Sequence, residues 1–401
     1  MSKMKNRWGV RLICVCIIGL IIYVGYIPWN NYLDARERVV GVEWVVPLSE
    51  IYSHWDNDIR KLDKDLKVLN LQLMIEDNND DASYEKLCGV KNSQGKIIIP
   101  PIYERLEIGS EQEYILAKNY DTKKYHYYKL DGTDFIKGDF QDVSMFENGY
   151  ACVEKKGQRY VIDMAGNVQL KVKCEWLSSF DSEKKLFQYE VKSKIHSSDG
   201  LGYWDTYDGL IDINGNVVLE PKYNMIQKAS ENRILVFYTN NKENWAGIYL
   251  DNNFQQVSTK SYEEATAFNQ GVAVVKDTKG WHIINENEEI ISDVPACQYM
   301  YAFSEGIAVA QFDKELKYLD TKGKVLFTLP YKSPEGQFLP DEICYYSEGL
   351  IAFPGRNQKL GYMDSKGRIV VEPVFDRAWP IENGEAMVEM YHGKKGVIKL
   401  K

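Results

Sequence analysis

After about residue 90, the 401-residue sequence has almost no segment with apolar residues at the i, i+3, i+4 and i+7 spacing of an amphipathic helix. It also lacks a lysine- or arginine-rich stripe beyond residue 11, and its formal net charge is −9. Nonspecific nucleic-acid binding needs a basic footprint that displaces counterions from the phosphates. These absences predict an all-β chain and argue against nucleic acid as a partner.

The cysteines lack the spacing of a disulfide framework or a metal site. Two of the seven lie in the apolar N-terminal run, and the other five contain no CxxC pair. We therefore expect buried free thiols at five dispersed positions, which are Cys88, Cys152, Cys174, Cys297 and Cys344.

Catalytic and metal-binding motifs are missing as well. The sequence has no G-x-S-x-G elbow, no phosphate-binding glycine loop and no HExxH. Its histidines occur singly, at His54, His126, His196, His282 and His392. Asp212 to Asn216 and Glu76 to Asp81 carry oxygen ligands suited to calcium, but a hairpin turn and a solvated loop are the favoured interpretations. We expect no catalytic residues, no metal and no cofactor.

One apolar stretch stands near the N-terminus. Residues 12–29 carry no charge and are just long enough to span a bilayer as a helix. Residues 1–11 are basic and predict a cytoplasmic stub, and residues 30–42 read as a juxtamembrane linker. The pattern predicts a single-pass signal anchor in the cell membrane with an extracytoplasmic C-terminal domain. A cleaved signal peptide is the alternative, although no small-x-small site is evident.

The stretch from Leu360 to Met390 is the clearest copy of an internal repeat. Gly361 to Asp364 and Arg368 to Glu372 alternate like two strands, joined by a glycine turn, and predict a hairpin. We expect Pro373 to end the hydrogen-bonded ladder, because proline has no backbone N–H. Asn383-Gly384 then leads into a third strand.

Eight such units are visible from Cys88 onward. Their turns contain glycine, or asparagine where a left-handed conformation is expected, at Gly95, Gly132, Gly166, Gly215, Asn253, Asn287, Gly323 and Gly367. A large apolar residue also recurs three positions before a glycine, in the pairs Phe146/Gly149, Phe268/Gly271, Phe303/Gly306, Tyr346/Gly349 and Ile381/Gly384. We expect the apolar residue to pack in the core while the glycine turns the backbone.

These two patterns, a G-x-[IV]-D-x-x-G-x-[IV]-V-x-P hairpin followed by F-x-x-G-x-A-x-V, resemble the bacterial WG-repeat family, also called KWG repeats. The resemblance covers about residues 86 to 401. The tryptophan that gives the family its name is absent, because Cys88, Asp208 and Leu360 are among the residues that precede the repeat glycine. The resemblance implies a repetitive β scaffold for binding or interaction and supplies no catalytic residue set.

The units predict about eight sheets of three or four strands, in a propeller-like toroid or an open β superhelix. Residues 43–85 resemble a split or degenerate first repeat, and residues 86–401 form the repeat domain. We expect the C-terminal strand, Gly393 to Lys401, to pair with the segment around Glu43 to Ile51. Leu69 to Glu76 is the expected third strand of that unit.

The longest departures from the repeat are candidate binding surfaces. The insertion from Lys194 to Asp208 carries the candidate ligand-binding residues Tyr203, Trp204, Asp205 and Tyr207, and a second insertion spans Tyr331 to Asp341. The predicted function is a membrane-anchored binding protein for a protein partner or a cell-envelope glycan. A glycan-active enzyme on a propeller-like scaffold and a purely structural or sensory domain are the alternatives.

Overall fold

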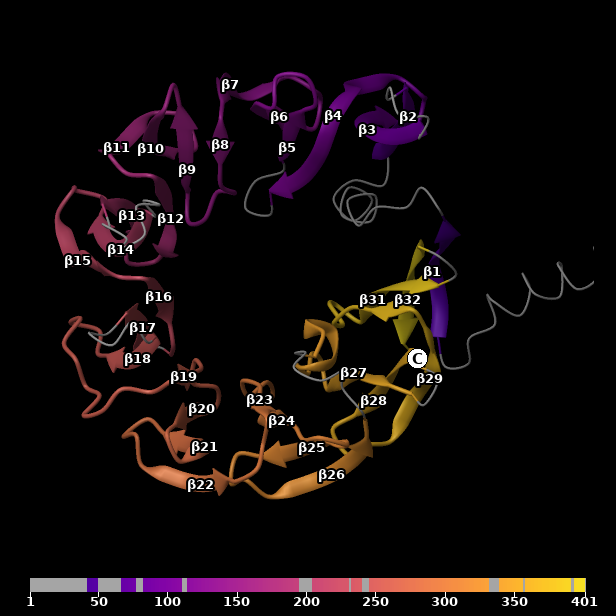
Figure 1. Ribbon diagram of the computed structural model, residues 1–401. Helices are drawn as coiled ribbons and strands as arrows, with labels where there is room; N and C mark the ends of the chain where they lie inside the picture. Colours follow the sequence, from indigo (N-terminus) through magenta and orange to yellow (C-terminus); the bar gives the residue numbers. More distant parts are fainter. Residues whose placement is uncertain are drawn as a thin grey trace, which may run out of the picture. The chain divides into compact units, whose positions relative to one another are not determined.

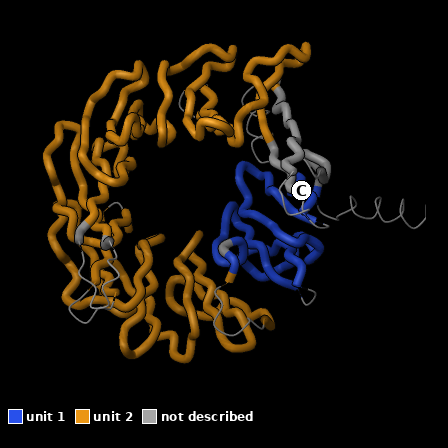
Figure 2. Tube along the Cα trace, turned by 45° about the horizontal axis from the view of Figure 1, so that its top comes forward, with its two compact units in different colours: residues 1–52, 340–401 blue, residues 53–339 orange. Residues whose placement is uncertain are grey.

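The computed structural model describes residues 42–49, 66–76, 82–109, 114–194, 204–230, 232–239, 245–331, 339–355, 358–390 and 393–400. Within these ranges the chain is all-β, and the one helical element is a 3-10 turn, η1 (Asp341–Ile343). The described strands form eight antiparallel sheets, built mainly from hairpins that follow one another along the chain (Figure 1). The chain divides into two compact units (Figure 2), comprising residues 53–339 and residues 1–52 with 340–401.

The unit of residues 53–339 contains six of the sheets. In chain order their strands are β2 (Leu66–Glu76), β3 (Ala82–Asn92), β4 (Ile97–Gly109), β5 (Tyr114–Asn119), β6 (Tyr125–Lys129) and β7 (Asp134–Phe140) in a six-stranded sheet; β8 (Asp142–Val143), β9 (Tyr150–Lys155), β10 (Gln158–Asp163) and β11 (Val168–Val172); β12 (Trp176–Asp181), β13 (Leu186–Lys194), β14 (Trp204–Asp212) and β15 (Val217–Tyr223); β16 (Met225–Lys228), β17 (Ile234–Thr239) and β18 (Trp245–Leu250); β19 (Glu264–Ala265), β20 (Val272–Asp277), β21 (Gly280–Asn285) and β22 (Ile290–Val294); and β23 (Tyr299–Met300), β24 (Ile307–Gln311), β25 (Glu315–Asp320) and β26 (Val325–Pro330).

The other unit contains two sheets. One consists of β27 (Leu350–Pro354), β28 (Leu360–Asp364) and β29 (Ile369–Phe375). The second has the order β1-β32-β31-β30, from β1 (Val42–Ser49), β32 (Lys394–Leu400), β31 (Glu385–Met390) and β30 (Arg377–Ala378). The prediction of about eight sheets is confirmed, although one of them has six strands. This sheet has six strands because the long strand β4 pairs with β3 through its first half and with β5 through its second half.

The pairing of β1 with β32 confirms the expected contact between the first and last described strands. Val42 lies opposite Leu400 and Trp44 opposite Ile398, in an antiparallel ladder. The prediction that Leu69 to Glu76 belongs to the same sheet is wrong, since β2 pairs with β3 along its whole length instead. β32 is therefore an interior strand, and β1 covers the backbone groups that its outer edge would otherwise expose.

Most of the hairpin turns share one local hydrogen-bonding pattern. In seven of them an aspartate or asparagine accepts the backbone N–H groups two and four residues later, or the latter alone, and thereby fixes the turn. These residues are Asn92, Asp163, Asp212, Asp251, Asn285, Asp320 and Asp364. The prediction of a left-handed residue is correct for the glycines, but in two turns the position is wrong. Phe254 (φ 61°) and Glu288 (φ 60°), rather than Asn253 and Asn287, adopt positive φ, because the Asx residue fixes the third position after itself.

The second recurring turn also matches its prediction. The five apolar residues that precede it are buried, from Ile381 at 2% exposed to Phe268 at 8%. Each glycine has φ between 74° and 80°, and the residue before it also has positive φ, for example Asn148 (47°) and Asn383 (55°). Two consecutive residues with positive φ are the geometry of a type I′ hairpin turn, whose twist matches that of the flanking strands.

Pro373 does not end its strand as predicted. β29 continues through it to Phe375, which lies opposite Leu360, while Val371 lies opposite Tyr362. The register shift between these pairs is a β-bulge that removes the proline nitrogen from the ladder. A proline in the repeat thus marks a bulge and not the end of the hairpin.

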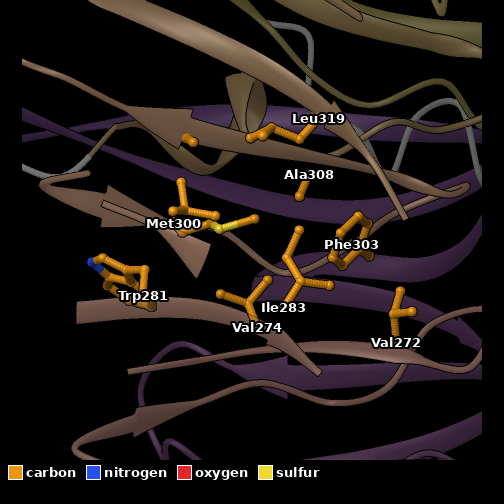
Figure 3. Close-up of a cluster of buried hydrophobic side chains, with 10 residues drawn as sticks. Val272, Val274, Trp281, Ile283, Met300, Phe303, Ala308 and Leu319 are labelled. Carbon is orange, nitrogen blue, oxygen red and sulfur yellow. The ribbon is translucent and has the colours of Figure 1, made fainter. Parts of the chain in front are cut away.

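The hydrophobic core lies between consecutive sheets. In the cluster of Figure 3, Val274 and Ile283 from β20 and β21 pack with Met300 and Ala308 of the following sheet and with Phe303 from the segment between β23 and β24. The alternation of the strands directs one row of side chains toward each neighbouring sheet.

The five dispersed cysteines are thiols, with Cys88, Cys152 and Cys344 buried and the other two half-buried.

Within the described ranges we find no helix with the length and apolar character needed to cross a bilayer. The predicted anchor at residues 12–29 lies outside those ranges.

Candidate binding site

The four predicted ligand-binding residues do not share a loop. Trp204, Asp205 and Tyr207 belong to β14, where Trp204 pairs with Lys194 and Tyr207 with Val191. Tyr203 lies outside the described residues, as do residues 332–338 of the second insertion. Of the insertion, Lys194 and residues 204–208 belong to the β13–β14 ladder, and residues 195–203 lie outside the described ranges. Tyr207 is half-buried, and the role of these residues in binding remains a prediction.

The calcium candidate at Asp212 to Asn216 is a repeat turn. The Asp212 carboxylate accepts backbone N–H groups of Asn214 (2.9 Å) and Asn216 (2.8 Å) and the Asn216 side-chain amide (2.8 Å). These hydrogen bonds, that of the Asn216 side chain first, lower the pKa of Asp212. Its oxygens are thus occupied by the chain itself. In the other candidate, Glu76 ends β2 and residues 77–81 lie outside the described ranges.

Two histidines lie in the described residues. His282 is 4% exposed and has a carboxylate at each ring nitrogen, with Asp293 at 2.7 Å from Nδ1 and Asp277 at 2.9 Å from Nε2. Such a closed arrangement fastens β20 to β21 and β22 and leaves no ring nitrogen for a ligand. His126 is more open and borders a groove. His54, His196 and His392 lie outside the described residues.

This groove is a candidate binding site in the described part of the molecule. It has a volume of about 700 Å³ and lies between the β6–β7 hairpin and the end of β9. All of its lining residues except one glycine have a charged or polar side chain, and they are Lys124, His126, Asp134, Lys137, Gly138, Asp139, Gln141, Lys155 and Lys156. We call it the lysine groove. Four lysines against two aspartates make it locally positive in a chain of net charge −9.

Asp139 partly balances the positive charge at one side of the lysine groove. Its carboxylate lies 3.6 Å from Lys124 Nζ and 3.6 Å from His126 Nδ1. Lys155 instead lies over the Phe140 ring, with Nζ 5.6 Å from the centroid. Lys137 and Lys156 are exposed and have no ion pair within the described residues. Two ammonium groups are therefore open to a ligand.

The lysine groove exists because this hairpin departs from the other repeats. In three others a glycine lies across a bulge from a proline, in the pairs Gly89/Pro101, Gly209/Pro221 and Gly361/Pro373. A Cβ at Gly89 would lie 2.5 Å from the Ile99 carbonyl oxygen and 2.7 Å from the Pro101 nitrogen, so the site excludes other residues. In the β6–β7 hairpin the same positions carry His126 and Gly138. In this hairpin the larger residue of the pair is therefore on the first strand and the glycine on the second, whereas the other three hairpins have the reverse.

Gly138 makes this exchange possible. Its φ of 152° is rarely adopted by other residues, and a Cβ there would lie 3.3 Å from Lys155 Nζ and 3.4 Å from the Phe140 ring. The neighbouring position is changed in charge. Lys137 stands where two other hairpins carry Glu220 and Glu372, and where the β3–β4 hairpin carries Pro100. The absence of a side chain at Gly138 thus opens the floor of the groove, and the lysine supplies its charge.

A fourth position also distinguishes the β6–β7 hairpin from the other three hairpins. Asp134 occupies the outward position at the start of the strand, where the other hairpins expose Ile97, Val217 and Ile369. Sequence reasoning missed this site because it searched the insertions. Aligning the repeats on their glycine and proline positions would have revealed the exchange of His126 and Gly138.

The chain was compared with known proteins. Among solved structures, a eukaryotic initiation factor is 14% identical with a TM-score of 0.42, over 66% of this chain and 76% of that chain. Citrobacter koseri AztD is 10% identical with a TM-score of 0.35, over 78% and 94%. An acylaminoacyl peptidase in complex with Z-Gly-Gly-Phe-chloromethyl ketone is 12% identical with a TM-score of 0.33, over 87% and 59%. No curated protein matches. Five segments, residues 89–118, 131–158, 209–242, 249–281 and 361–394, match the family model described as the WG containing repeat.

Proposed function

We propose that this chain is a membrane-anchored, extracytoplasmic binding protein without catalytic activity. The anchor is the uncharged segment of residues 12–29 with its basic flank, and the ligand is a protein partner or a cell-envelope glycan. The lysine groove is the observation that most strongly supports a binding role. In a scaffold of repeated hairpins, one hairpin departs from the shared pattern at several positions that together form a polar recess.

The placement in the membrane is tested in bacterial cells that express the full chain. Carbonate extraction should leave the protein with the membranes. Protease added to intact spheroplasts should digest the repeat domain and spare a cytoplasmic control protein. A repeat domain that is digested only after the spheroplasts are lysed would contradict the proposed orientation.

The binding role is tested by pull-down of isolated cell-envelope material with the detergent-solubilised full chain. Trp204→Ala should weaken capture if the start of β14 contributes as predicted. Trp245→Ala is the matched control, since Trp245 is 52% exposed at the start of β18. Capture of neither protein nor glycan by the unmodified chain would contradict a binding function. Equal capture by the two variants would exclude β14 from the binding site but would not contradict the binding function.

A further inference from the structure

The lysine groove has a composition that selects one class of ligand. We propose that it binds an anionic carbohydrate, a saccharide that carries carboxylate or phosphate groups beside its hydroxyls. This inference builds on the proposed binding function and names the ligand class of the groove. It rests on the residues of a single hairpin and the strand next to it.

The positive groups account for the anion. Lys137 and Lys156 have no ion pair within the described residues, and Lys155 lies on an aromatic ring and not against a carboxylate. An ammonium group offers three donors to a carboxylate or phosphate oxygen. The positive charge is local, because the whole chain is acidic and two other hairpins carry glutamate at the position of Lys137.

The remaining groups account for the hydroxyls. Asp134 and Asp139 are exposed carboxylates that accept hydrogen bonds from sugar hydroxyls. Gln141 is held in place, since its Oε1 accepts the N–H of Gly157 at 3.1 Å, and this leaves its amide NH₂ to face the ligand. A purely anionic ligand would be repelled by the two carboxylates. A ligand that combines anionic groups with hydroxyls satisfies both sets.

Other ligand classes fit the lysine groove less well. A nucleotide base requires a ring to stack on, and the only ring among the lining residues is that of His126. His126 itself stacks on Tyr128, with centroids 6.1 Å apart and an interplanar angle of 21°. A peptide that binds as an added strand or an amphipathic helix is anchored by side chains in pockets or an apolar groove, whereas no apolar side chain lines the lysine groove. Hydrogen-bonding groups therefore dominate recognition.

The test measures binding by titration calorimetry with the full chain in a non-ionic detergent. The probes are trigalacturonate, which carries carboxylates, and glucose 1-phosphate, which carries a phosphate. Maltotriose supplies hydroxyls without charge, inorganic phosphate supplies charge without hydroxyls, and a triglutamate peptide supplies carboxylates on a peptide. At least one anionic saccharide should bind ten-fold or more tighter than maltotriose, inorganic phosphate and triglutamate. Increasing salt should weaken the binding of this saccharide. The better of the two saccharides identifies the anionic group.

Two variants assign the binding to the groove. The double variant Lys137→Gln/Lys156→Asn removes two charges and keeps a residue that tolerates positive φ at position 156 (φ 53°). It should weaken saccharide binding about ten-fold or more. The matched control is Lys96→Gln/Lys322→Gln, which removes two exposed lysines from the turns of other repeats and should bind like the unmodified chain.

A second variant, His126→Gly/Gly138→Pro, gives the hairpin the glycine and proline of the other repeats. It should keep the circular dichroism spectrum and lose saccharide binding, because the proline ring fills the floor of the groove. Unchanged affinity in the lysine variant would overturn the proposal, as would equal binding of maltotriose or triglutamate. Envelope capture that persists in the lysine variant would overturn the ligand assignment and leave the proposed binding function intact.

Discussion

The carboxylate of Glu348 accepts the backbone N–H of Gly384 at 2.8 Å, and it also accepts that of Asn383 at 2.5 Å. Both partners belong to the type I′ turn of the next repeat. One turn therefore holds the following turn within the unit of residues 1–52 and 340–401. A carboxylate at two adjacent N–H groups forms charge-assisted hydrogen bonds, which are stronger than neutral ones.

The first prediction concerns this link. Glu348→Gln should lower the free energy of unfolding by about 1 kcal/mol, because the neutral amide supplies only one acceptor atom and no charge. Urea denaturation followed by tryptophan fluorescence measures the difference. Glu382→Gln, in the next turn, is exposed and serves as the control. A loss of equal size in the control would show that the hydrogen bonds between the turns do not stabilise the fold.

The second prediction is acid sensitivity at Asp277. Burial is the largest single effect and acts to raise the pKa of this carboxyl, but the hydrogen bonds from His282, the Lys279 N–H and Lys260 together outweigh it and lower the pKa to about 2. The folded pKa lies below the ordinary value of 3.8, so the stabilisation is present above pH 4 and is lost as the pH falls toward 2. It amounts to roughly 2 kcal/mol.

Asp277→Asn should therefore be less stable than the unmodified chain at pH 7, and the difference should shrink between pH 4 and pH 2. Urea denaturation across this range gives the comparison. The exposed Asp313→Asn provides the same chemical change without the histidine. A difference that does not vary with pH would rule out the ionised Asp277 carboxylate as its cause.

The third prediction has the opposite sign. Asp208 is 8% exposed, and burial raises the pKa of its carboxyl to about 6, despite the hydrogen bond from Gln188 at 2.8 Å. A raised pKa means that the folded state loses stability as the pH rises from about 4 through 6. The ionised, buried carboxylate costs up to about 3 kcal/mol at neutral pH.

Asp208→Asn should thus gain stability relative to the unmodified chain as the pH is raised from 4 to 7. Thermal denaturation at several pH values measures this change, with the exposed Asp121→Asn as the control. The prediction is wrong if the melting temperatures of the two chains run parallel over this range. The residue occupies the position before the repeat glycine, where Cys88 and Leu360 stand in other repeats.

The fourth prediction concerns the last strand. Truncation after Tyr391 removes β32, an interior strand of its sheet, and leaves β1 without its partner. Amide exchange should then accelerate at residues 42–49, far away in sequence, and the melting transition should shift to lower temperature. Removal of Lys401 alone should leave both unchanged. Exchange that accelerates only near the new C-terminus would contradict the cooperative role of the pairing.

The sequence determined the repeat because the repeat is made of local interactions. An Asx residue, a glycine three positions later and alternating apolar residues lie within a few residues of each other, and hydrogen bonds of those same residues form the turns. The pairing of the first and last strands was also predictable. Each end of the array left an edge whose backbone groups required a partner.

Tertiary structure alone determined which of the differences between the repeats produces a candidate binding site. The sequence shows His126 and Gly138 as two unremarkable residues, twelve positions apart, and shows an insertion before Asp208 as the obvious departure. Folding puts His126 and Gly138 on opposite sides of one bulge, where the glycine leaves space that a proline fills elsewhere. It also adds Lys155 and Lys156 from β9 and the turn that follows it. A groove depends on which side chains meet across strands, and the spacing of residues along the chain does not specify that.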